Sequence, residues 1–461
     1  MNNHRGRIKK IEVLELKAII QHGSIFGDIL AIPSKSNLHR QLIYAALADT
    51  ATHIICADTQ AEDITATVDC LTALGAVITK DEDGLCVGAS PHFSDTNLVG
   101  MPPRSLDSSP RDKKTSSEVR LPCGESGSTL RFMLPIVCAM GLRGAFEMKG
   151  RLPNRPLGPL DSQLEKHGIK IWRDTNEVLN VDGQLTAGEF TLPGDVSSQY
   201  ISGLLMALPL LNKPSTLTIT PPFESADYVE MTLDTSKEFN CEIVPKIKGK
   251  NIEYAISPTP YKSPLRTQTE GDWSNGAFWL CAGAMNGGNI RLGGLRNDSK
   301  QGDRLILDIL QKMGADIACN EQIIHVKENK RKCVEVDSRA IPDLIPVLAA
   351  VAATCEGTSV FKNASRLRLK ESDRLTATAQ TLAALGADID ETPDGLIVHG
   401  KATLRGGEVD SFGDHRIAMM AAIASAACTE PVIVNGAQAV NKSYPRFWDD
   451  LRILGKRVEF C

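Results

Sequence analysis

Apolar residues recur at helical spacing in six segments of the chain, and each segment ends in the same way. A glycine or asparagine follows the last apolar position, and a short run of alternating apolar and polar residues comes next. This pattern predicts an amphipathic helix, a left-handed C-terminal cap and then a β-strand. The six segments are 64–78, 157–171, 228–243, 304–317, 375–389 and 447–460.

The stop residues of these segments set a period of about 70 positions. They are Gly75, Gly168, Asn240, Gly314, Gly386 and Gly455. The first interval is longer by about 20 positions, which matches a polar run at 95–118 that is rich in proline, serine and charge and typical of an inserted surface loop. A period of this length is too long for a solenoid, so each copy is predicted to be a small α/β module.

Chain length predicts the number of domains. At 461 residues the chain is too long for one compact core, so we expect two domains with three modules each. A hydrophobic content of 42% and a charged content of 23% are ordinary for a soluble globular protein. The midpoint of the six segments falls after Asn240. Pro260, Pro264 and Gly271 follow it and favour a break between the two domains there.

Charge, cysteine usage and hydropathy exclude several classes of protein. A net charge of -5 argues against nucleic-acid binding through bulk charge. The 12 cysteines include no C-x-x-C pair, which favours small buried side chains in a reducing compartment over zinc or disulfide sites. The longest apolar runs, near 345–355 and 417–428, are shorter than the roughly 18 residues of a membrane span. We therefore expect a soluble, cytoplasmic protein.

Short charged motifs lie between the repeated segments. The clearest is KESDR at 370–374, because cations at a helix N-terminus are unfavourable unless an anion lies between them. The cations of these motifs are Lys35, Arg40, Arg131, Arg155, Lys370, Arg374, Arg416 and Lys442. Their convergence predicts a ligand with several negative charges, such as two phosphates or a phosphate and a carboxylate. Asp343 and Glu371 would then be candidates for proton transfer.

Each motif taken alone also has a plainer interpretation. The turn LPCGESGSTLRF at 121–132 suits an anion, but simple helix capping explains it equally well. Arg155 alone is more simply a solvated loop arginine, and the hydroxyls of 197–198 fit a plain N-cap. His415 fits a structural histidine at a helix start at least as well as a site residue, and Asp373 fits a helix-end residue.

Nine motifs in order resemble the signatures of one enzyme family. They are SKSNLHR, CGESGSTLR, NRPLGPL, SSQY, EGDWS, IPDLIPVLA, RLKESDRL, GDHRIAM and NKSYPRFW. The chain resembles the 5-enolpyruvylshikimate-3-phosphate synthase family over nearly its whole length, except for the run at 95–118 and the first dozen residues. The resemblance implies the enolpyruvyl transferase fold, a two-domain inside-out α/β barrel with three βαβαββ units per domain and six in all.

The same resemblance implies a domain layout and a reaction. The N-terminal domain would be 34–264, and the C-terminal domain would combine 1–33 with 265–461, with the active site in the cleft between them. The implied reaction transfers the enolpyruvyl group of phosphoenolpyruvate to the 5-hydroxyl of shikimate 3-phosphate through a tetrahedral intermediate and releases phosphate. It implies no cofactor, no metal, no nucleic-acid or membrane partner, and a monomer.

Matching the motifs position by position implies the site residues. Asp343 resembles the base that faces the 5-hydroxyl, Glu371 the acid that serves the methylene carbon, and Lys35 the lysine that touches both ligands. The implied shikimate 3-phosphate contacts are Lys35, Ser36, Arg40, Ser197, Ser198, Gln199, Ser225, Tyr228, Asp343, Arg366 and Lys370. The implied phosphoenolpyruvate contacts are Lys35, Gly127, Arg155, Gln199, Arg374, Arg416 and Lys442.

Two residues depart from the family's pattern, and two other functions compete with this interpretation. Glu125 stands where many members of the family carry asparagine, and Arg366 stands where some do. A UDP-N-acetylglucosamine enolpyruvyl transferase would share the fold, but it lacks KESDRL and GDHR and uses a reactive cysteine, whereas Cys123 lies in an apolar turn and is expected to be structural. A non-catalytic repeat scaffold that binds anions would have no need for Asp343 and Glu371.

Overall fold

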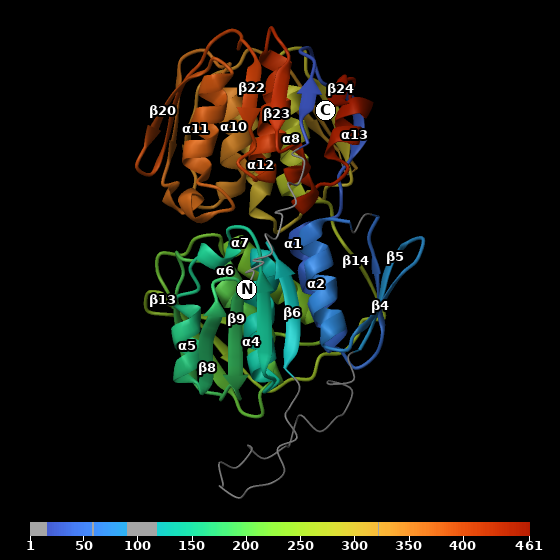
Figure 1. The fold of residues 1–461 in the computed structure, drawn as a ribbon, viewed down its shortest axis with the longest axis vertical. Coiled ribbons are helices and arrows are strands. Elements are labelled where there is room, and N and C mark those ends of the chain that lie inside the picture. Colours follow the sequence, from blue (N-terminus) through green and yellow to red (C-terminus); the bar gives the residue numbers. More distant parts are fainter. Residues whose placement is uncertain (1–15, 58–59, 90–117, 321) are drawn as a thin grey trace, which may run out of the picture.

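The structure is a computed structural model with two lobes (Figure 1). It describes residues 16–57, 60–89, 118–320 and 322–461. The buried hydrophobic residues form two separate clusters, one within 38–261 and the other made of 18–25 together with 273–458. From residue 16 onward, the described chain therefore starts in one lobe, builds the core of the other, and returns to complete the first. Residues 95–117 of the predicted insertion lie outside the described residues.

Six four-stranded sheets, counted over the described residues, repeat one topology. In one of them β6 (Val119–Gly124) and β7 (Gly144–Met148) are parallel, and helix α4 (Gly127–Ala139) connects them. Helix α5 (Leu160–Lys166) then leads to two antiparallel strands, β8 (Ile169–Thr175) and β9 (Val178–Gly183). This is the predicted βαβαββ unit.

Two further units are continuous in the chain. The first consists of β10 (Glu189–Pro193), α6 (Ser198–Ala207), β11 (Ser215–Thr220), α7 (Ala226–Glu238), β12 (Pro245–Lys248) and β13 (Asn251–Ile256). The second consists of β18 (Glu335–Asp337), α10 (Ile345–Ala352), β19 (Thr358–Lys362), α11 (Arg374–Ala384), β20 (Asp388–Thr392) and β21 (Gly395–His399).

The remaining three units combine segments that are distant in the chain. One holds α1 (Lys35–Leu47), β3 (Thr52–Ile55), α2 (Glu62–Ala73), β4 (Val77–Lys80), β5 (Gly84–Gly88) and β14 (Arg266–Gln268). Another holds β2 (Phe26–Leu30), α8 (Trp273–Ala284), β15 (Asn289–Gly293), α9 (Ile306–Lys312), β16 (Asp316–Cys319) and β17 (Ile323–Lys327). The last holds β1 (Ala18–Ile20), β22 (Gly407–Asp410), α12 (His415–Ala424), β23 (Val432–Asn435), α13 (Phe447–Ile453) and β24 (Val458–Phe460).

Strand pairing closes the units at the points where the chain crosses between lobes. β14 is parallel to β3, although its residues follow Pro264, where the sequence predicts the crossing. An isolated bridge between Pro33 and Gly271 then brings the two crossing strands side by side. At the other end, β1 supplies the strand that the sixth repeat lacks, because it pairs with both β23 and β24.

The six amphipathic segments contain helices, as predicted, and each of these is the second helix of its unit. They are α2, α5, α7, α9, α11 and α13. Each is followed by its predicted stop residue with a positive φ, at 88° for Gly75, 95° for Gly168, 61° for Asn240, 94° for Gly314, 93° for Gly386 and 88° for Gly455. Glycine and asparagine adopt this left-handed conformation most readily, so they end the helix there.

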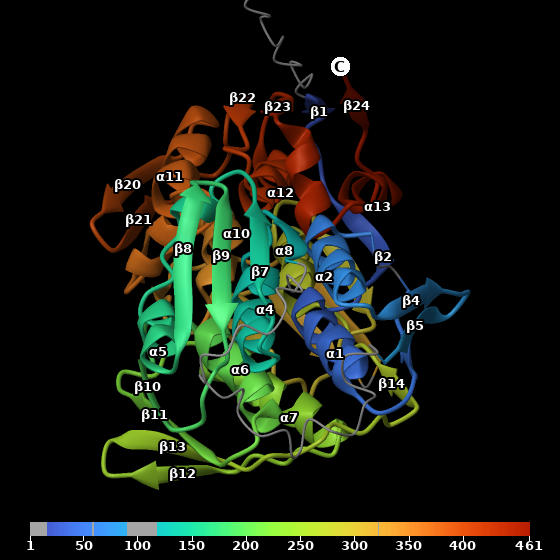
Figure 2. The same ribbon diagram turned by 60° about the horizontal axis from the view of Figure 1, so that its bottom comes forward.

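The first helix of each unit is buried on nearly all sides. Every residue of α8, α10 and α12 is buried, and so are nearly all residues of α4 and α6. A helix that is apolar all round must lie inside the protein. Figure 2 shows β4 and β5 at one margin of the molecule and β12 and β13 at another, so these sheets lie toward the outside. Across the described residues, no helix combines the length and apolarity needed to cross a membrane.

The left-handed stop residues give a direct test of the repeat. A Cβ atom at Gly314 would lie 2.3 Å from the carbonyl oxygen of Lys330, and φ is 94° there. Gly314→Ala should therefore destabilise the protein by more than the roughly 1–2 kcal/mol of a left-handed alanine, since backbone must also move. Urea denaturation followed by circular dichroism measures this as a lower midpoint.

Gly249→Ala is the matched control for this substitution. Its φ is 65°, but a Cβ atom there meets nothing within 4 Å. It should show only the conformational cost of a left-handed residue. An equal or larger loss of stability in Gly249→Ala than in Gly314→Ala would contradict the steric account.

Candidate active site

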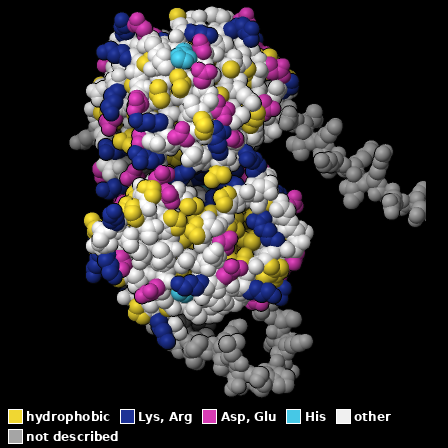
Figure 3. All heavy atoms as spheres, turned by 90° about the vertical axis from the view of Figure 1, so that its left-hand side faces the viewer, with side chains coloured by type: hydrophobic (Ala, Val, Ile, Leu, Met, Phe, Trp, Pro, Cys, Tyr) yellow, Lys and Arg dark blue, Asp and Glu magenta, His cyan; other side chains and the backbone are white. Residues whose placement is uncertain are grey.

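A cavity of about 150 Å³ lies where the starts of all six buried helices meet. One lining residue from each start is Lys35 (α1), Gly127 (α4), Ser198 (α6), Ser274 (α8), Asp343 (just before α10) and Arg416 (α12). The N-terminus of a helix carries partial positive charge and free N–H groups. Six such ends around one cavity therefore favour anionic ligands. In Figure 3 the surface narrows between the two lobes, and charged side chains of both signs lie along this waist.

Side-chain caps fix five of these helix starts. The caps are Ser34, Ser126, Ser197, Asp272 and Asp414, and each accepts a hydrogen bond from a backbone N–H in the first turn. The plainer interpretation of the 121–132 and 197–199 motifs is therefore correct as far as it goes. Ser128, two residues after Ser126, and Ser198, directly after Ser197, also line the cavity. The same turns thus cap their helices and face the site.

Arg374 is the most heavily paired cation of the site. It is 2% exposed and donates to three carboxylates, at 2.7 Å to Asp414, 2.6 Å to Asp343 and 2.8 Å to Glu371. Burial lowers the pKa of this guanidinium, but the three carboxylates raise it well above its ordinary value. Asp373 caps α11, as expected, and the neighbouring Ser372 donates to Asp414.

Asp343 also accepts from Arg374, and two further cations lie beside it. Lys370 Nζ is 3.3 Å from Oδ1, and Arg416 Nη2 is 3.5 Å from Oδ2. Burial raises the pKa of Asp343, but Lys370, Arg416 and Arg374 together hold it well below its ordinary value. Asp343 is therefore ionised near neutral pH, as a base must be before it accepts a proton.

Glu371 is held between two arginines that come from different lobes. Arg155 Nη1 is 3.3 Å from Oε1, and Arg374 Nη2 is 2.8 Å from Oε2. Burial raises the pKa of Glu371. Arg155 and Arg374 lower it by more, so the pKa lies well below its ordinary value. An anion that bound these arginines would compete for them and raise that pKa.

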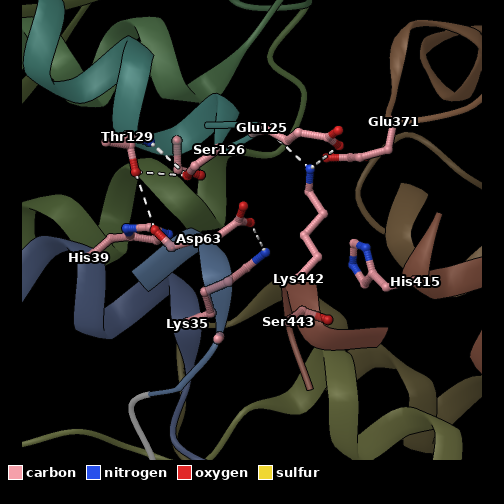
Figure 4. A network of polar contacts seen from close by, with 12 residues as sticks. Lys35, His39, Asp63, Glu125, Ser126, Thr129, Glu371, His415, Lys442 and Ser443 are labelled. Carbon is pink, nitrogen blue, oxygen red and sulfur yellow. Dashed lines mark hydrogen bonds and ion pairs between the residues drawn. The ribbon is translucent and has the colours of Figure 1, made fainter. Parts of the chain in front are cut away.

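Lys35 is held by two aspartates. Its Nζ donates to Asp63 at 2.5 Å, and its backbone N–H donates to Asp272 at 3.0 Å. Burial raises the pKa of Asp63, but Lys35 and then Lys442 bring it down to about 2. Figure 4 shows Asp63 pointing at Lys35 from the start of α2. This role of Asp63 is not visible in the sequence, because an acidic residue in a first helical turn is typical of any amphipathic helix.

Lys442 and Glu125 pair with each other, and neither lines the cavity. Lys442 Nζ donates to the backbone oxygen of Glu125 at 3.0 Å and lies 3.5 Å from its carboxylate (Figure 4). Burial lowers the pKa of Lys442, but Asp63 and Glu371 raise it above its ordinary value overall. Glu125 therefore has a cationic partner.

His415 lines the cavity, and burial with Lys35 nearby holds its pKa well below the ordinary value.

Arg40 lines the cavity but is already bonded to protein. It donates to Thr232 at 2.8 Å, to the carbonyl of Tyr228 at 2.7 Å and to the carbonyl of Ser36 at 2.5 Å. Burial lowers its pKa to about 10.

Arg131, one of the cations of the charged motifs, donates to Gln199 at 2.7 Å, and Gln199 donates onward to Ser128 at 2.8 Å.

The structure brings together every predicted site residue except one along the cavity wall. Lys442 is not among the lining residues and contacts Glu125. The wall also contains side chains that the sequence did not single out for the site, namely Asp63, Phe132, Pro156, Val196, Tyr200, Asp272, Ser274, Pro342 and Leu369. In the described part of the chain, no group of three or more His, Cys, Asp or Glu is arranged to hold a metal ion. Cys123 is fully buried, and burial with Cys70 beside it raises its pKa well above the ordinary value, so it is structural as expected.

The fold is that of an enolpyruvyl transferase. The chain resembles the structure of EPSP synthase from Acinetobacter baumannii with a TM-score of 0.74 at 23% identity, covering 97% of this chain and 100% of that one. It resembles the enolpyruvyl transferase NikO from Streptomyces tendae with a TM-score of 0.71 at 18% identity, covering 97% and 99%.

Sequence similarity narrows this class to one family. The model of the EPSP synthase (3-phosphoshikimate 1-carboxyvinyltransferase) family matches residues 20–451. The 3-phosphoshikimate 1-carboxyvinyltransferase of Clostridium novyi is 42% identical, covering 94% of this chain and 96% of its own, and that of Clostridium acetobutylicum is 41% identical with the same coverage. The chain belongs to the EPSP synthase family.

Asp414 is the carboxylate on which the geometry around Arg374 depends. It is 0% exposed, and it accepts from Arg374, from Ser372 and from the backbone N–H of Arg416. Asp414→Ala would leave a buried guanidinium short of a partner and remove the cap of α12, so we expect a loss of stability of about 3–5 kcal/mol. Urea denaturation measures it. The control is Asp388→Ala, an exposed residue, and a similar loss in both variants would contradict the argument.

Proposed function

We propose that this protein transfers the enolpyruvyl group of phosphoenolpyruvate to the 5-hydroxyl of shikimate 3-phosphate and releases phosphate. The observation that carries the proposal is the placement of Asp343 and Glu371 on one buried guanidinium, inside a cavity walled by cations and helix N-termini. Membership of the EPSP synthase family supports it, as do relatives named 3-phosphoshikimate 1-carboxyvinyltransferase at about 40% identity.

In the proposed addition step, Asp343 removes the proton of the 5-hydroxyl. The freed oxygen attacks C2 of phosphoenolpyruvate, and Glu371 delivers a proton to the methylene carbon, which becomes a methyl group. The product is a tetrahedral intermediate that carries both substrates. Each positioned acid or base contributes roughly 10²–10⁴-fold to such a reaction.

In the proposed elimination step, the carbon–oxygen bond to phosphate breaks. Glu371, now a base, takes a proton back from the methyl group, and Lys35 supplies a proton to the departing phosphate oxygen. The contact of Lys35 with Asp63 at 2.5 Å holds its ammonium group in place for this role. The surrounding cations stabilise the charge that develops on the phosphate.

The proposed addition step requires a proton on Glu371. Arg155 and Arg374 hold its pKa well below the ordinary value, and a carboxylate cannot act as an acid until it carries a proton. Phosphoenolpyruvate is proposed to bind these two arginines with its own phosphate and carboxylate. Its negative charge then offsets theirs and raises the pKa of Glu371, so substrate binding prepares the acid.

The remaining predicted contacts divide between the two substrates. We propose that phosphoenolpyruvate binds Lys35, Gly127, Arg155, Gln199, Arg374, Arg416 and Lys442. We propose that shikimate 3-phosphate binds Lys35, Ser36, Arg40, Ser197, Ser198, Gln199, Ser225, Tyr228, Asp343, Arg366 and Lys370. A Cβ atom at Gly127 would lie 2.7 Å from Arg131 and 2.8 Å from Arg155, so glycine there lets both guanidinium groups approach the turn.

We further propose domains that follow the predicted division, with the second crossing moved past β14. The pairing of β14 with β3 and the bridge between Pro33 and Gly271 support a boundary near 270 rather than at Pro264. We also propose that the protein works as a monomer in the cytoplasm.

A turnover assay tests the proposed reaction. Purified protein is mixed with phosphoenolpyruvate and either shikimate 3-phosphate or UDP-N-acetylglucosamine, and phosphate release is followed. We expect release with shikimate 3-phosphate alone. Release only with the sugar nucleotide would assign the other enolpyruvyl transfer, and release with neither acceptor would favour a binding scaffold.

Amide substitutions test the two proton-transfer roles. Glu371→Gln and Asp343→Asn keep shape and remove the titrating group, so each should lower kcat by at least about 10²-fold while substrate binding is retained. Steady-state kinetics and equilibrium binding of each substrate measure the two effects. Glu165→Gln, on an exposed face of α5, serves as the control. Turnover within a few-fold of the unmodified enzyme in both site variants would refute these roles.

A further inference from the structure

An ion pair crosses the cleft at a place that neither proton-transfer group occupies. Arg366, in the 3-10 helix η5 (Ser365–Leu369), donates Nη1 to Glu224 at 3.0 Å and to the hydroxyl of Ser225 at 3.2 Å. Its neighbour Leu367 belongs to the core of the upper lobe in Figure 1, whereas Val229, in the helix after Glu224, belongs to the core of the lower lobe. The two charged side chains are only 20% and 14% exposed, so solvent screens the pair less than it screens a surface pair.

The lower-lobe side of this pair is fixed by its backbone. The N–H of Glu224 donates to the carbonyl of Gly194 at 2.9 Å. Ser225 has a φ of 55°, a conformation that serine rarely adopts, and it precedes α7 without making a side-chain cap. Its hydroxyl accepts from Arg366 instead. Backbone strain of this kind persists where the surroundings enforce it, and it is common at binding sites.

The upper-lobe side of the pair keeps donors free for a ligand. Arg366 lines the cavity together with Ser225, Tyr228 and Lys370. Among the described residues, only Nη1 of Arg366 has a hydrogen-bond partner, and Nε and Nη2 have none. The edge formed by Nε and Nη2 is the part of a guanidinium that binds a phosphate through two parallel hydrogen bonds.

We propose that Glu224 is a positioning residue that holds Arg366 for the phosphate group of the acceptor and closes this end of the cleft. The inference rests on the proposed function. Glu224 binds one nitrogen of the guanidinium and so fixes its plane, which leaves the opposite edge to the phosphate of shikimate 3-phosphate. Because the two residues come from different lobes, the phosphate contact is complete only when the cleft is closed.

The contrary possibility is that Glu224 competes with the phosphate for Arg366. A competing carboxylate would weaken acceptor binding, so its removal would lower the KM for shikimate 3-phosphate. A positioning carboxylate strengthens binding, so its removal raises that KM. The two accounts therefore predict opposite signs for one measurement.

Steady-state kinetics of Glu224→Gln test the proposal. We expect the KM for shikimate 3-phosphate to rise about fivefold, as for the loss of one charge-assisted hydrogen bond. The values of kcat and of the KM for phosphoenolpyruvate should stay within about twofold, because the chemistry lies elsewhere. Glu230→Gln is the matched control, since it lies exposed on α7 and should leave all three values unchanged.

A double-variant cycle shows whether Glu224 acts through Arg366. Arg366→Gln alone should raise the KM for shikimate 3-phosphate, and adding Glu224→Gln to it should have no further effect. A fall in KM in Glu224→Gln, an equal rise for both substrates, or an effect that persists in the Arg366→Gln background would overturn the proposal. Failure of the proposed function is separate from these outcomes, because the unmodified protein would then show no turnover with shikimate 3-phosphate at all.

Discussion

Positive charge converges on one cavity, and the rest of the structure is organised to hold it there. Six buried helices begin at the cavity, and each brings the positive end of its dipole. Lysine and arginine side chains add whole charges to the same volume. Such a cluster would repel itself unless carboxylates were placed among the cations. Asp414, Asp343 and Glu371 around Arg374, and Asp63 beside Lys35, provide that compensation.

The repeat explains how so many helix ends reach one place. Each βαβαββ unit contributes one largely buried helix, and three units surround the core of each lobe. The buried helices of both lobes begin at the cleft, so six units give six N-termini. Strands β1, β2 and β14 complete units whose other segments lie far along the chain, and this lets the chain cross between lobes without leaving a sheet unfinished.

The sequence predicts the outer helices well because each has one apolar face and a glycine or asparagine stop. The buried helices lack that periodicity, since a helix such as α8 or α12 is apolar on every side and its sequence does not distinguish it from a buried strand. The site motifs are visible in the sequence through cations at a helix start and through the family resemblance. Asp63 and Glu224 are not, because acidic residues near a helix start have an ordinary explanation, and only the folded chain places them against Lys35 and Arg366.

Pairing of the site cations with carboxylates has a consequence for ligand binding. Arg155 and Arg374 contact Glu371, Lys370 contacts Asp343, and Lys442 contacts Glu125. An anionic ligand therefore exchanges partners with carboxylates and gains only the difference between the two sets of contacts. Shape must then supply much of the selectivity, because a ligand benefits only if its charges fit several cations at once. The same exchange changes the pKa of the displaced carboxylates, so in this site binding and proton transfer depend on the same ion pairs.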